Sequence, residues 1–356
     1  MDVSIVIPTY NEAENIQPLV DSVSEELDDR EFEILIVDDD SPDGTADEVK
    51  ELQDERDFLR LYEREGKNGI GSAYKEGFQK VTGDKIVQMD ADFSHPPRYI
   101  NDLLEALEDN DVAVGSRYVE DGDRQDPLHR RIFPLIGSYL YRYGIGFPVK
   151  DFTSGFKAYN KEVMHIFEED LPDGFHFQAA SLLRIVEGDY SVKEVPIEFE
   201  ERRAGKPKYD HMDLVKNGVF FGKTFLRKNQ RPLKFGTVGA SGVAVDMTLL
   251  YLLTEYAGLF PVLSVIIATE SAILWNYTWN DLWTFKGLGK QTVKDFVSRA
   301  LKFNAISLVG LGIKVAVFWA LTEYIGLYYL LANLIAIFVV FAWNYLGNIT
   351  WTWNEA

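Results

Sequence analysis

Residues 85–92 decide the fold: in Lys85-Ile86-Val87-Gln88-Met89-Asp90-Ala91-Asp92 a short apolar run leads directly into two aspartates. Two earlier apolar runs, at residues 3–7 and 33–37, also end in polar clusters, at residues 8–12 and 38–44. Each run is followed by a turn and a stretch of helical character, an alternation typical of a mostly parallel α/β sheet. Because ligands bind at the carboxyl ends of such strands, the three polar clusters are predicted to line one crevice.

Composition divides the chain of 356 residues into two parts. Residues 1–226 are charged and mixed, whereas residues 227–356 are dominated by long apolar runs, which predicts a soluble domain followed by a membrane domain. The net charge of −20 comes from the first part and argues against nucleic acid as a partner. No Gly-x-Gly-x-x-Gly follows the first apolar run, which disfavours a dinucleotide enzyme.

Asp90 and Asp92 are candidate metal ligands, because both are predicted to lie at the edge of the sheet. Carboxylate oxygens suit Mg²⁺ or Mn²⁺, which takes one or two protein carboxylates and completes its shell with phosphates and water. A solvated turn is the alternative for an Asp-x-Asp pair, but the preceding strand and the two other acidic strand ends favour a metal. Asp39 is expected to accept a hydrogen bond from a nucleobase or a ribose hydroxyl, with a charged turn as the alternative.

Five segments, in this order, resemble family 2 glycosyltransferases and among them the dolichol-phosphate mannose synthases: residues 8–12, 37–45, 69–74, 89–96 and 114–118. The resemblance covers almost the whole first domain. It implies a GT-A fold, which is Rossmann-like with a mostly parallel sheet, inversion at the anomeric carbon, and GDP-mannose as the donor. Residues 151–156 also resemble the family, near the expected sugar pocket, and a plain turn is the alternative for them.

Matching positions in that family imply roles for the donor-site residues. Asp92 would take the metal, and Ser94 stands where some relatives place a ligating glutamine, so its metal contact is either direct or through water. Asp90 and Ala91 would contact the donor. The residues implied for the nucleoside are Pro8, Tyr10, Glu12, Val37 and Asp39.

A phosphate acceptor needs positioning rather than a general base, because a second pKa of about 6 leaves it largely ionised at neutral pH. Basic side chains are therefore predicted in an otherwise acidic domain, and the planar fork of arginine suits phosphate oxygens. Each candidate taken singly can be a surface charge, and the resemblance selects among them. Arg117 and Arg130, with Arg131 beside it, are expected at the acceptor phosphate, and Arg202 and Lys208 at the nucleotide-sugar. The predicted catalytic residues are Asp90, Asp92, Arg117 and Arg130.

Four apolar stretches in the second part, each near the 20 residues that a spanning helix needs, predict an all-α transmembrane domain. They lie at residues 235–256, 261–280, 303–324 and 328–347. A shift of about 68 positions aligns the first pair of stretches with the second without a gap, including Trp275-Asn276-Tyr277 with Trp343-Asn344-Tyr345. The domain is therefore predicted to consist of two tandem hairpin repeats, related by a pseudo-twofold axis along the membrane normal.

Lysines and arginines precede the first stretch and separate the second from the third, while the two outer turns have none. This distribution places both chain ends on the cytoplasmic side, in agreement with an N-terminus that carries no signal-peptide pattern. Residues 132–147 and 214–226 are amphipathic and are predicted as interfacial helices. The tail resembles the GtrA-like four-helix family, which has been linked to lipid translocation; a plain membrane anchor is the alternative.

The sequence features predict an integral membrane enzyme that uses Mg²⁺ or Mn²⁺, and the family resemblance implies that it moves mannose from GDP-mannose to dolichyl or polyprenyl phosphate. In a prokaryote its location would be the cell membrane. One alternative uses UDP-glucose on the same scaffold, and another is a non-catalytic lipid translocase or scaffold.

Overall fold

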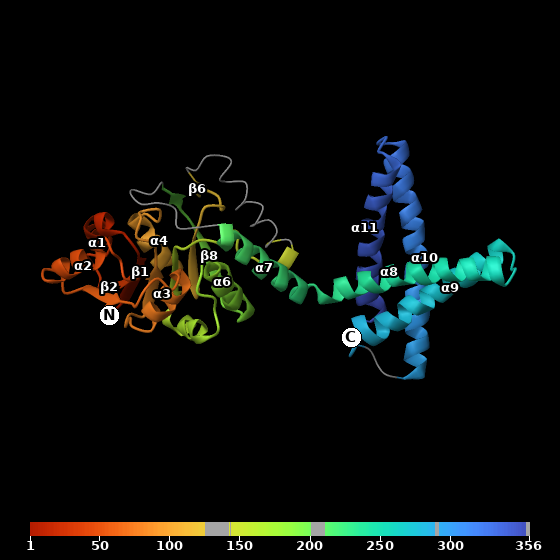
Figure 1. Cartoon of the computed structure of the whole chain (residues 1–356), viewed down its shortest axis with the longest axis horizontal. Helices are drawn as coiled ribbons and strands as arrows, with labels where there is room; N and C mark the ends of the chain where they lie inside the picture. The colour runs from red at the N-terminus through yellow and green to blue at the C-terminus, as the bar shows by residue number, and fades with distance from the viewer. Residues whose placement is uncertain (125–141, 143, 201–210, 289–291, 354–356) are drawn as a thin grey trace. The chain divides into compact units, whose positions relative to one another are not determined.

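The computed structural model describes residues 1–124, 142, 144–200, 211–288 and 292–353 (Figure 1). The chain forms two compact units, Met1–Phe225 and Leu226–Ala356. The predicted interfacial helix at residues 132–147 lies for the most part outside the described residues. The second predicted interfacial stretch, residues 214–226, falls within helix α7 (His211–Lys228).

A seven-stranded sheet forms the centre of the first unit, and its order is β3-β2-β1-β4-β7-β5-β8. All neighbouring strands run parallel except β7, which is antiparallel to both β4 and β5. This mostly parallel sheet confirms the predicted fold class. The strands are β1 (Val3–Thr9), β2 (Phe32–Asp38), β3 (Leu59–Glu63), β4 (Lys85–Gln88), β5 (Val112–Ser116), β7 (Lys157–Asn160) and β8 (Val192–Pro196). A separate parallel pair joins β6 (Asp123–Arg124) to β9 (Glu198–Phe199).

Helices cover both faces of the sheet because side chains along each strand alternate between the faces. In β1, Val3, Ile5 and Ile7 pack into one core and Val6 into the other. The first core is closed by α1 (Ala13–Glu26), α2 (Thr45–Gln53) and α4 (Ile100–Ala106), the last of which follows the short 3₁₀ helix η1 (Pro97–Tyr99). The second is closed by α3 (Ile70–Phe78), α6 (Phe177–Glu187) and the 3₁₀ helix η2 (Lys161–Glu168).

The strand register brings the polar clusters to one edge of the sheet. Thr9 at the end of β1 pairs with Asp38 at the end of β2. Gln88 at the end of β4 pairs with Val6, so the chain beyond it reaches the same edge as the loop after β1. The antiparallel strand β7 begins at this edge, which places the residues immediately before it, including Gly155, beside the end of β4.

In its described residues, the second unit contains four long helices and three π-helical turns. In order they are α8 (Gln230–Tyr251), η3 (Leu252–Tyr256), α9 (Pro261–Trp279), η4 (Asn280–Thr284), α10 (Val293–Glu323), α11 (Tyr329–Gly347) and η5 (Asn348–Thr352). Three described segments are long and apolar enough to cross a membrane: Gln230–Tyr256, Val293–Glu323 and Tyr329–Thr352. Polar residues such as Glu270 and Asn276 lower the hydropathy of α9, so four spanning helices are not confirmed.

Helix α10 begins about ten residues before the predicted apolar stretch at residue 303. The hydroxyl of Thr292 caps it by accepting a hydrogen bond of 3.2 Å from the backbone N–H of Asp295. The first turns after this cap are charged, so a search for apolar runs does not detect them.

The aromatic contacts between the two hairpins, α8–α9 and α10–α11, repeat the sequence duplication. The rings of Phe235 and Tyr345 lie 5.7 Å apart, and their counterparts Phe303 and Tyr277 lie 5.9 Å apart. Phe285 stacks at 4.3 Å on Trp353, its own counterpart in the second repeat, and this pair therefore lies on the pseudo-twofold axis. The duplicated architecture is confirmed by these paired distances.

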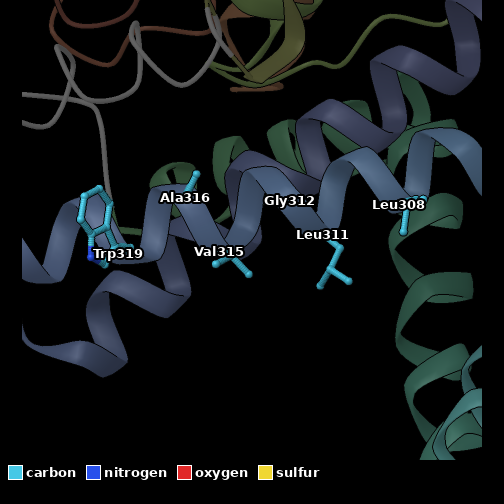
Figure 2. A pocket seen from close by; sticks show the side chains of 6 residues that line it. All are labelled: Leu308, Leu311, Gly312, Val315, Ala316 and Trp319. Atoms are coloured by element: carbon cyan, nitrogen blue, oxygen red, sulfur yellow. The ribbon is translucent and has the colours of Figure 1, made fainter.

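An apolar hollow of about 540 Å³ runs along the outer face of α10 (Figure 2). Its lining residues are Leu308, Leu311, Gly312, Val315, Ala316 and Trp319, and most of them are exposed. An outward-facing apolar surface on a helix of this length is typical of contact with lipid tails.

Candidate functional site

Two aspartates in the loop after β2 hold that loop in place. Asp38 accepts hydrogen bonds from the hydroxyls of Thr9 at 2.8 Å and Ser41 at 2.6 Å. Asp43 accepts from the hydroxyl of Thr45 at 2.6 Å and from the backbone N–H of Ala13 at 3.1 Å. Partial burial acts to raise the pKa of Asp43, but these hydrogen bonds outweigh it and lower the pKa below its usual value. Both carboxylates serve to shape the edge of the sheet.

Asp39, the predicted nucleoside contact, is buried at the same edge and bound by Arg64. Its backbone N–H donates to the carbonyl of Thr9 at 3.0 Å, and its carboxylate accepts a hydrogen bond from the Arg64 guanidinium. Burial raises the pKa of Asp39, and the Arg64 charge opposes that shift. The guanidinium also binds Ser72 at 2.5 Å and Glu76 at 3.0 Å, which ties Asp39 to helix α3. The carboxylate is therefore held in one orientation.

Arg64 was not predicted from the sequence. It follows β3 directly, and β3 is an edge strand in which Leu59 and Leu61 alternate with polar residues. That alternation, followed by a charged residue, is the signal that would have indicated a fourth strand end at the site.

The other predicted nucleoside residues lie on the ends of β1 and β2. Pro8 pairs with Val37 in the sheet, and the Val37 side chain is fully buried, so only its backbone can meet a ligand. Tyr10 is half-buried, with the Lys67 ammonium 4.3 Å from the centre of its ring. Glu12 accepts a hydrogen bond of 2.7 Å from the side chain of Asn15. The structure thus brings these residues together with Asp39.

The loop after β4 presents its two aspartates differently. The Asp90 side chain is 30% exposed and accepts a hydrogen bond of 3.3 Å from the Tyr74 hydroxyl. Asp92 is only 6% exposed, and its Oδ1 accepts from the backbone N–H of Ser94 at 3.1 Å and from the Ser94 hydroxyl at 2.5 Å. Phe93, which lies between Asp92 and Ser94, adopts a left-handed conformation with φ of 64°, and this turns the loop sharply. Ser94 therefore orients Asp92.

His95 supports this loop from behind. Its Nδ1 accepts a hydrogen bond of 3.1 Å from the backbone N–H of Asp90, which leaves the ring proton on Nε2. The ring is buried and stacks 5.2 Å from Phe156. Burial lowers the pKa of His95, so the imidazole is neutral at physiological pH. A Cβ at Gly155 would lie 2.9 Å from this ring and 3.4 Å from the Asp90 oxygens, so only glycine fits there.

The donor atoms at Asp90, Asp92 and Ser94 are all oxygens, which is the chemistry that Mg²⁺ and Mn²⁺ prefer. Among the described residues there is no group of three or more His, Cys, Asp or Glu side chains that could hold a metal. A site with one or two carboxylates, completed by the oxygens of a diphosphate, fits this arrangement.

Arg117, at the end of β5, forms a bidentate ion pair with Asp151. Its Nε and Nη2 donate to the two Asp151 oxygens at 2.7 Å each, and its backbone N–H donates at 3.1 Å. Burial acts to raise the pKa of Asp151, but the Arg117 charge and its hydrogen bonds lower it below the usual value. The Thr153 hydroxyl also accepts from Arg117 at 2.9 Å. An acceptor phosphate would therefore have to share this guanidinium with Asp151.

Lys157 is a buried cation beneath the site that the sequence did not single out. Its Nζ donates to the side-chain oxygen of Gln178 at 2.7 Å, and Gln178 accepts a second hydrogen bond of 2.9 Å from Gln88. Burial lowers the pKa of Lys157 to about 7, against the opposing charges of Asp151 and Asp90. A lysine at the start of a strand reads as a surface residue in sequence, so no pattern would have identified it.

Four of the predicted basic residues, Arg130, Arg131, Arg202 and Lys208, lie outside the described residues.

Comparison with known proteins decides the family. Residues 4–167 match the family described as "Glycosyl transferase family 2", and residues 234–353 match "GtrA/DPMS, transmembrane domain". The chain is 36% identical over 362 residues to the dolichol-phosphate mannosyltransferase of Pyrococcus furiosus, and the match covers 99% of each chain. This chain is a family 2 glycosyltransferase. The resemblance seen in its sequence motifs is thereby confirmed.

Two other relatives match a little more than half of the chain. The polyprenol monophosphomannose synthase of Mycolicibacterium smegmatis is 37% identical over 57% of this chain and 79% of its own. The undecaprenyl-phosphate mannosyltransferase of Micrococcus luteus is 34% identical over 58% and 87%. Among solved structures, glucosyl-3-phosphoglycerate synthase of Mycobacterium tuberculosis with Mn²⁺, UDP-glucose and glycerol 3-phosphate is 18% identical, with a TM-score of 0.47 over 64% of this chain and 79% of its own.

Proposed function

We propose that this glycosyltransferase moves mannose from GDP-mannose to a polyprenyl phosphate such as dolichyl phosphate. The observation that carries the proposal is the convergence of Asp39, Asp90, Asp92 and Arg117 on one edge of the sheet. Acidic side chains suited to a nucleoside and a metal-bound diphosphate there lie close to a cation suited to a phosphate. The full-length relative named for this activity supports the same choice of substrates.

The donor would lie across the ends of β1, β2 and β4. Asp39 would accept a hydrogen bond from the base or the ribose, in the orientation that Arg64 gives it. Asp92, oriented by Ser94, would hold Mg²⁺ or Mn²⁺, and such an ion supplies positive charge to the departing diphosphate. Asp90 is the more exposed of the two aspartates and would contact the donor sugar or its phosphate. Ser94 acts through Asp92 in this account.

The acceptor would supply its own nucleophile. An ionised phosphate oxygen attacks the anomeric carbon, the bond from that carbon to the nucleoside diphosphate breaks, and the configuration inverts. No proton has to be removed, because the phosphate monoester is already largely ionised at neutral pH. The neutral, buried His95 agrees with this, since its imidazole supports the loop backbone instead of facing a substrate. Arg117 would place the phosphate, sharing its guanidinium with Asp151.

The membrane part completes the assignment. We propose that residues 1–226 form the catalytic domain and residues 227–356 the membrane domain, with both chain ends on the cytoplasmic side. Lysines and arginines at the ends of the hairpins, together with outer turns that lack them, support this orientation. A polyprenyl phosphate in the cytoplasmic leaflet would then present its headgroup on the same side as the catalytic domain.

A donor panel tests the proposal. The full-length protein in vesicles that contain dolichyl phosphate is incubated with Mg²⁺ and labelled GDP-mannose or UDP-glucose. Labelled lipid is expected from GDP-mannose. Labelled lipid from UDP-glucose alone would show that UDP-glucose, not GDP-mannose, is the donor. If neither nucleotide-sugar gave a labelled lipid, a translocase or scaffold would be favoured instead.

A further inference from the structure

The second unit contains two arginines that the duplication makes equivalent, and among the described residues only one of them pairs with a carboxylate. Arg231 and Arg299 correspond to each other in the two repeats, as do Phe235 and Phe303, each one helical turn further along. The Phe303 ring contacts Tyr277, and the Phe235 ring contacts its counterpart Tyr345. Arg231 also lies within electrostatic range of Tyr345. The two arginines therefore occupy matching places about the pseudo-twofold axis.

Arg299 forms an ion pair with the carboxylate of Asp281. Arg299 donates from Nε to Asp281 Oδ1 at 3.0 Å and from Nη2 to Asp281 Oδ2 at 3.4 Å. The Trp353 indole N–H donates to the same Asp281 oxygen at 2.9 Å. The side chains of Arg299 and Asp281 are only 7% and 11% exposed. The Arg299–Asp281 pair shows that an anionic group fits beside the arginine at this position of the repeat.

Around Arg231, the positions equivalent to Asp281 and Trp353 are occupied by apolar residues. Ile349 stands at the position equivalent to Asp281, and Phe285 stands at the position equivalent to Trp353. Arg231 is exposed, and within the described ranges no carboxylate forms an ion pair with it. Lys234, one turn further along α8, lies with its ammonium 5.4 Å from the Trp283 ring and adds positive charge to the same end of the helix.

We propose that Arg231, supported by Lys234, binds the phosphate headgroup of a membrane lipid in the place that the Asp281 carboxylate fills in the other repeat. Arginine presents a planar fork of donors that matches phosphate oxygens, and it lies here at an end of a helix long and apolar enough to span. Anionic headgroups occur at this depth, and the surrounding aromatic rings accommodate the apolar part of a lipid. The proposal requires that α8 enters a bilayer at this end, and it does not depend on mannosyl transfer.

Two variants of the full-length protein test this site directly. Arg231→Gln removes the cation, and Ile349→Asp supplies the carboxylate that the first repeat already has. Ile349→Asn is the matched control, because it adds a polar group of the same size without charge. The proteins are purified in detergent, and binding of dolichyl phosphate, a phosphatidylglycerol and uncharged dolichol is measured by native mass spectrometry.

Uncharged dolichol should bind more weakly than dolichyl phosphate, and the Ile349→Asp variant should bind the phosphate lipids more weakly than the parent protein. Loss of a charge-assisted phosphate contact predicts about a 10-fold or greater loss for Arg231→Gln and Ile349→Asp, and a change of less than about 2-fold for Ile349→Asn. Because the catalytic domain is itself proposed to bind a polyprenyl phosphate, only the binding that Ile349→Asp weakens reports on this site. A loss confined to dolichyl phosphate would identify a polyprenyl phosphate as the occupant, and an equal loss for phosphatidylglycerol would identify the phosphate headgroup in general; both support the site. Equal binding of dolichol, or unchanged binding by Ile349→Asp, would overturn it. The Asp variant decides the matter even if the Gln variant does not fold.

Discussion

The Asp151→Asn variant probes the ion pair that holds Arg117. Asp151 is completely buried, and its two oxygens accept three hydrogen bonds from Arg117. Asparagine keeps one acceptor oxygen and turns an amide N–H₂ group toward the guanidinium, which is itself only 9% exposed. The substitution therefore removes the Asp151 charge from an almost buried cation.

The structure sets the expected size of the effect. Removing one partner of a buried ion pair costs about 3–5 kcal/mol, because the remaining charge stays desolvated. A loss of about 3 kcal/mol corresponds to a decrease in Tm of roughly 6–12 °C for a unit of this size. The pKa of Asp151 is below its ordinary value, so the carboxylate contributes this stability above pH 3.8 and loses it as the pH falls further. At neutral pH the whole effect should be visible.

The assay combines thermal unfolding with steady-state kinetics on the full-length protein in lipid nanodiscs. We expect the Tm to fall and the KM for polyprenyl phosphate to rise by about 10-fold, while the KM for the donor changes little. Asp28→Asn, at an exposed surface position, is the control and should match the parent. Arg117→Met combined with Asp151→Asn should be more stable than Asp151→Asn alone, because the desolvated guanidinium is removed together with the Asp151 charge. A Tm within 2 °C of the parent for Asp151→Asn, which corresponds to less than about 1 kcal/mol, would refute the reasoning.

Three further substitutions test other parts of the site. Gly155→Ala would bring a Cβ to 2.9 Å from the His95 ring, and the displaced loop should lower kcat/KM for the donor by about 10-fold in initial-rate measurements. Arg64→Gln removes the cation that orients Asp39, and titration calorimetry should show nucleoside diphosphate binding weakened by about 10-fold, whereas unchanged binding would exclude an orienting role. Lys157 has a pKa of about 7 in the fold, so between pH 7 and 10.5 the unfolded chain binds a proton that the folded chain lacks, and stability rises with pH. Lys157→Met should abolish that rise, which amounts to at most about 1.4 kcal/mol per pH unit, in unfolding midpoints recorded across this range.

The common edge of the site could be predicted because it depends on local patterns. Apolar runs that end in Asp39 and Asp90 identify strands and their carboxyl ends without any knowledge of distant contacts. The side chains that contact the site residues could not be predicted in this way. Arg64 reaches Asp39 only through the packing of the sheet. The same packing pairs Arg117 with Asp151, a residue of the segment 151–156 that the family resemblance had indicated without its partner, and the burial that lowers the pKa of Lys157 is a property of the folded core.

The membrane part shows the same division. The duplication was visible in sequence because matching residues recur at a constant spacing, and the paired aromatic contacts repeat it in space. The early start of α10 was missed because a capping hydrogen bond from Asp295 to Thr292, rather than hydrophobicity, fixes its first turn. The difference between Arg231 and Arg299 needed the structure, since Ile349 and Asp281 acquire meaning only once the ion pair is known.

We propose that the edge of the sheet formed by Asp39, Asp90 and Asp92 carries out mannosyl transfer to a lipid phosphate. The most direct measurement compares the parent protein with Asp92→Asn in vesicles that contain dolichyl phosphate, Mg²⁺ and labelled GDP-mannose, with the anomeric configuration of the lipid product determined by NMR. We expect a β-linked mannosyl phosphate from the parent and at least a 100-fold lower rate from Asp92→Asn, a loss of roughly 2.7 kcal/mol of transition-state stabilisation. Undiminished transfer by Asp92→Asn, or a product with retained configuration, would contradict it.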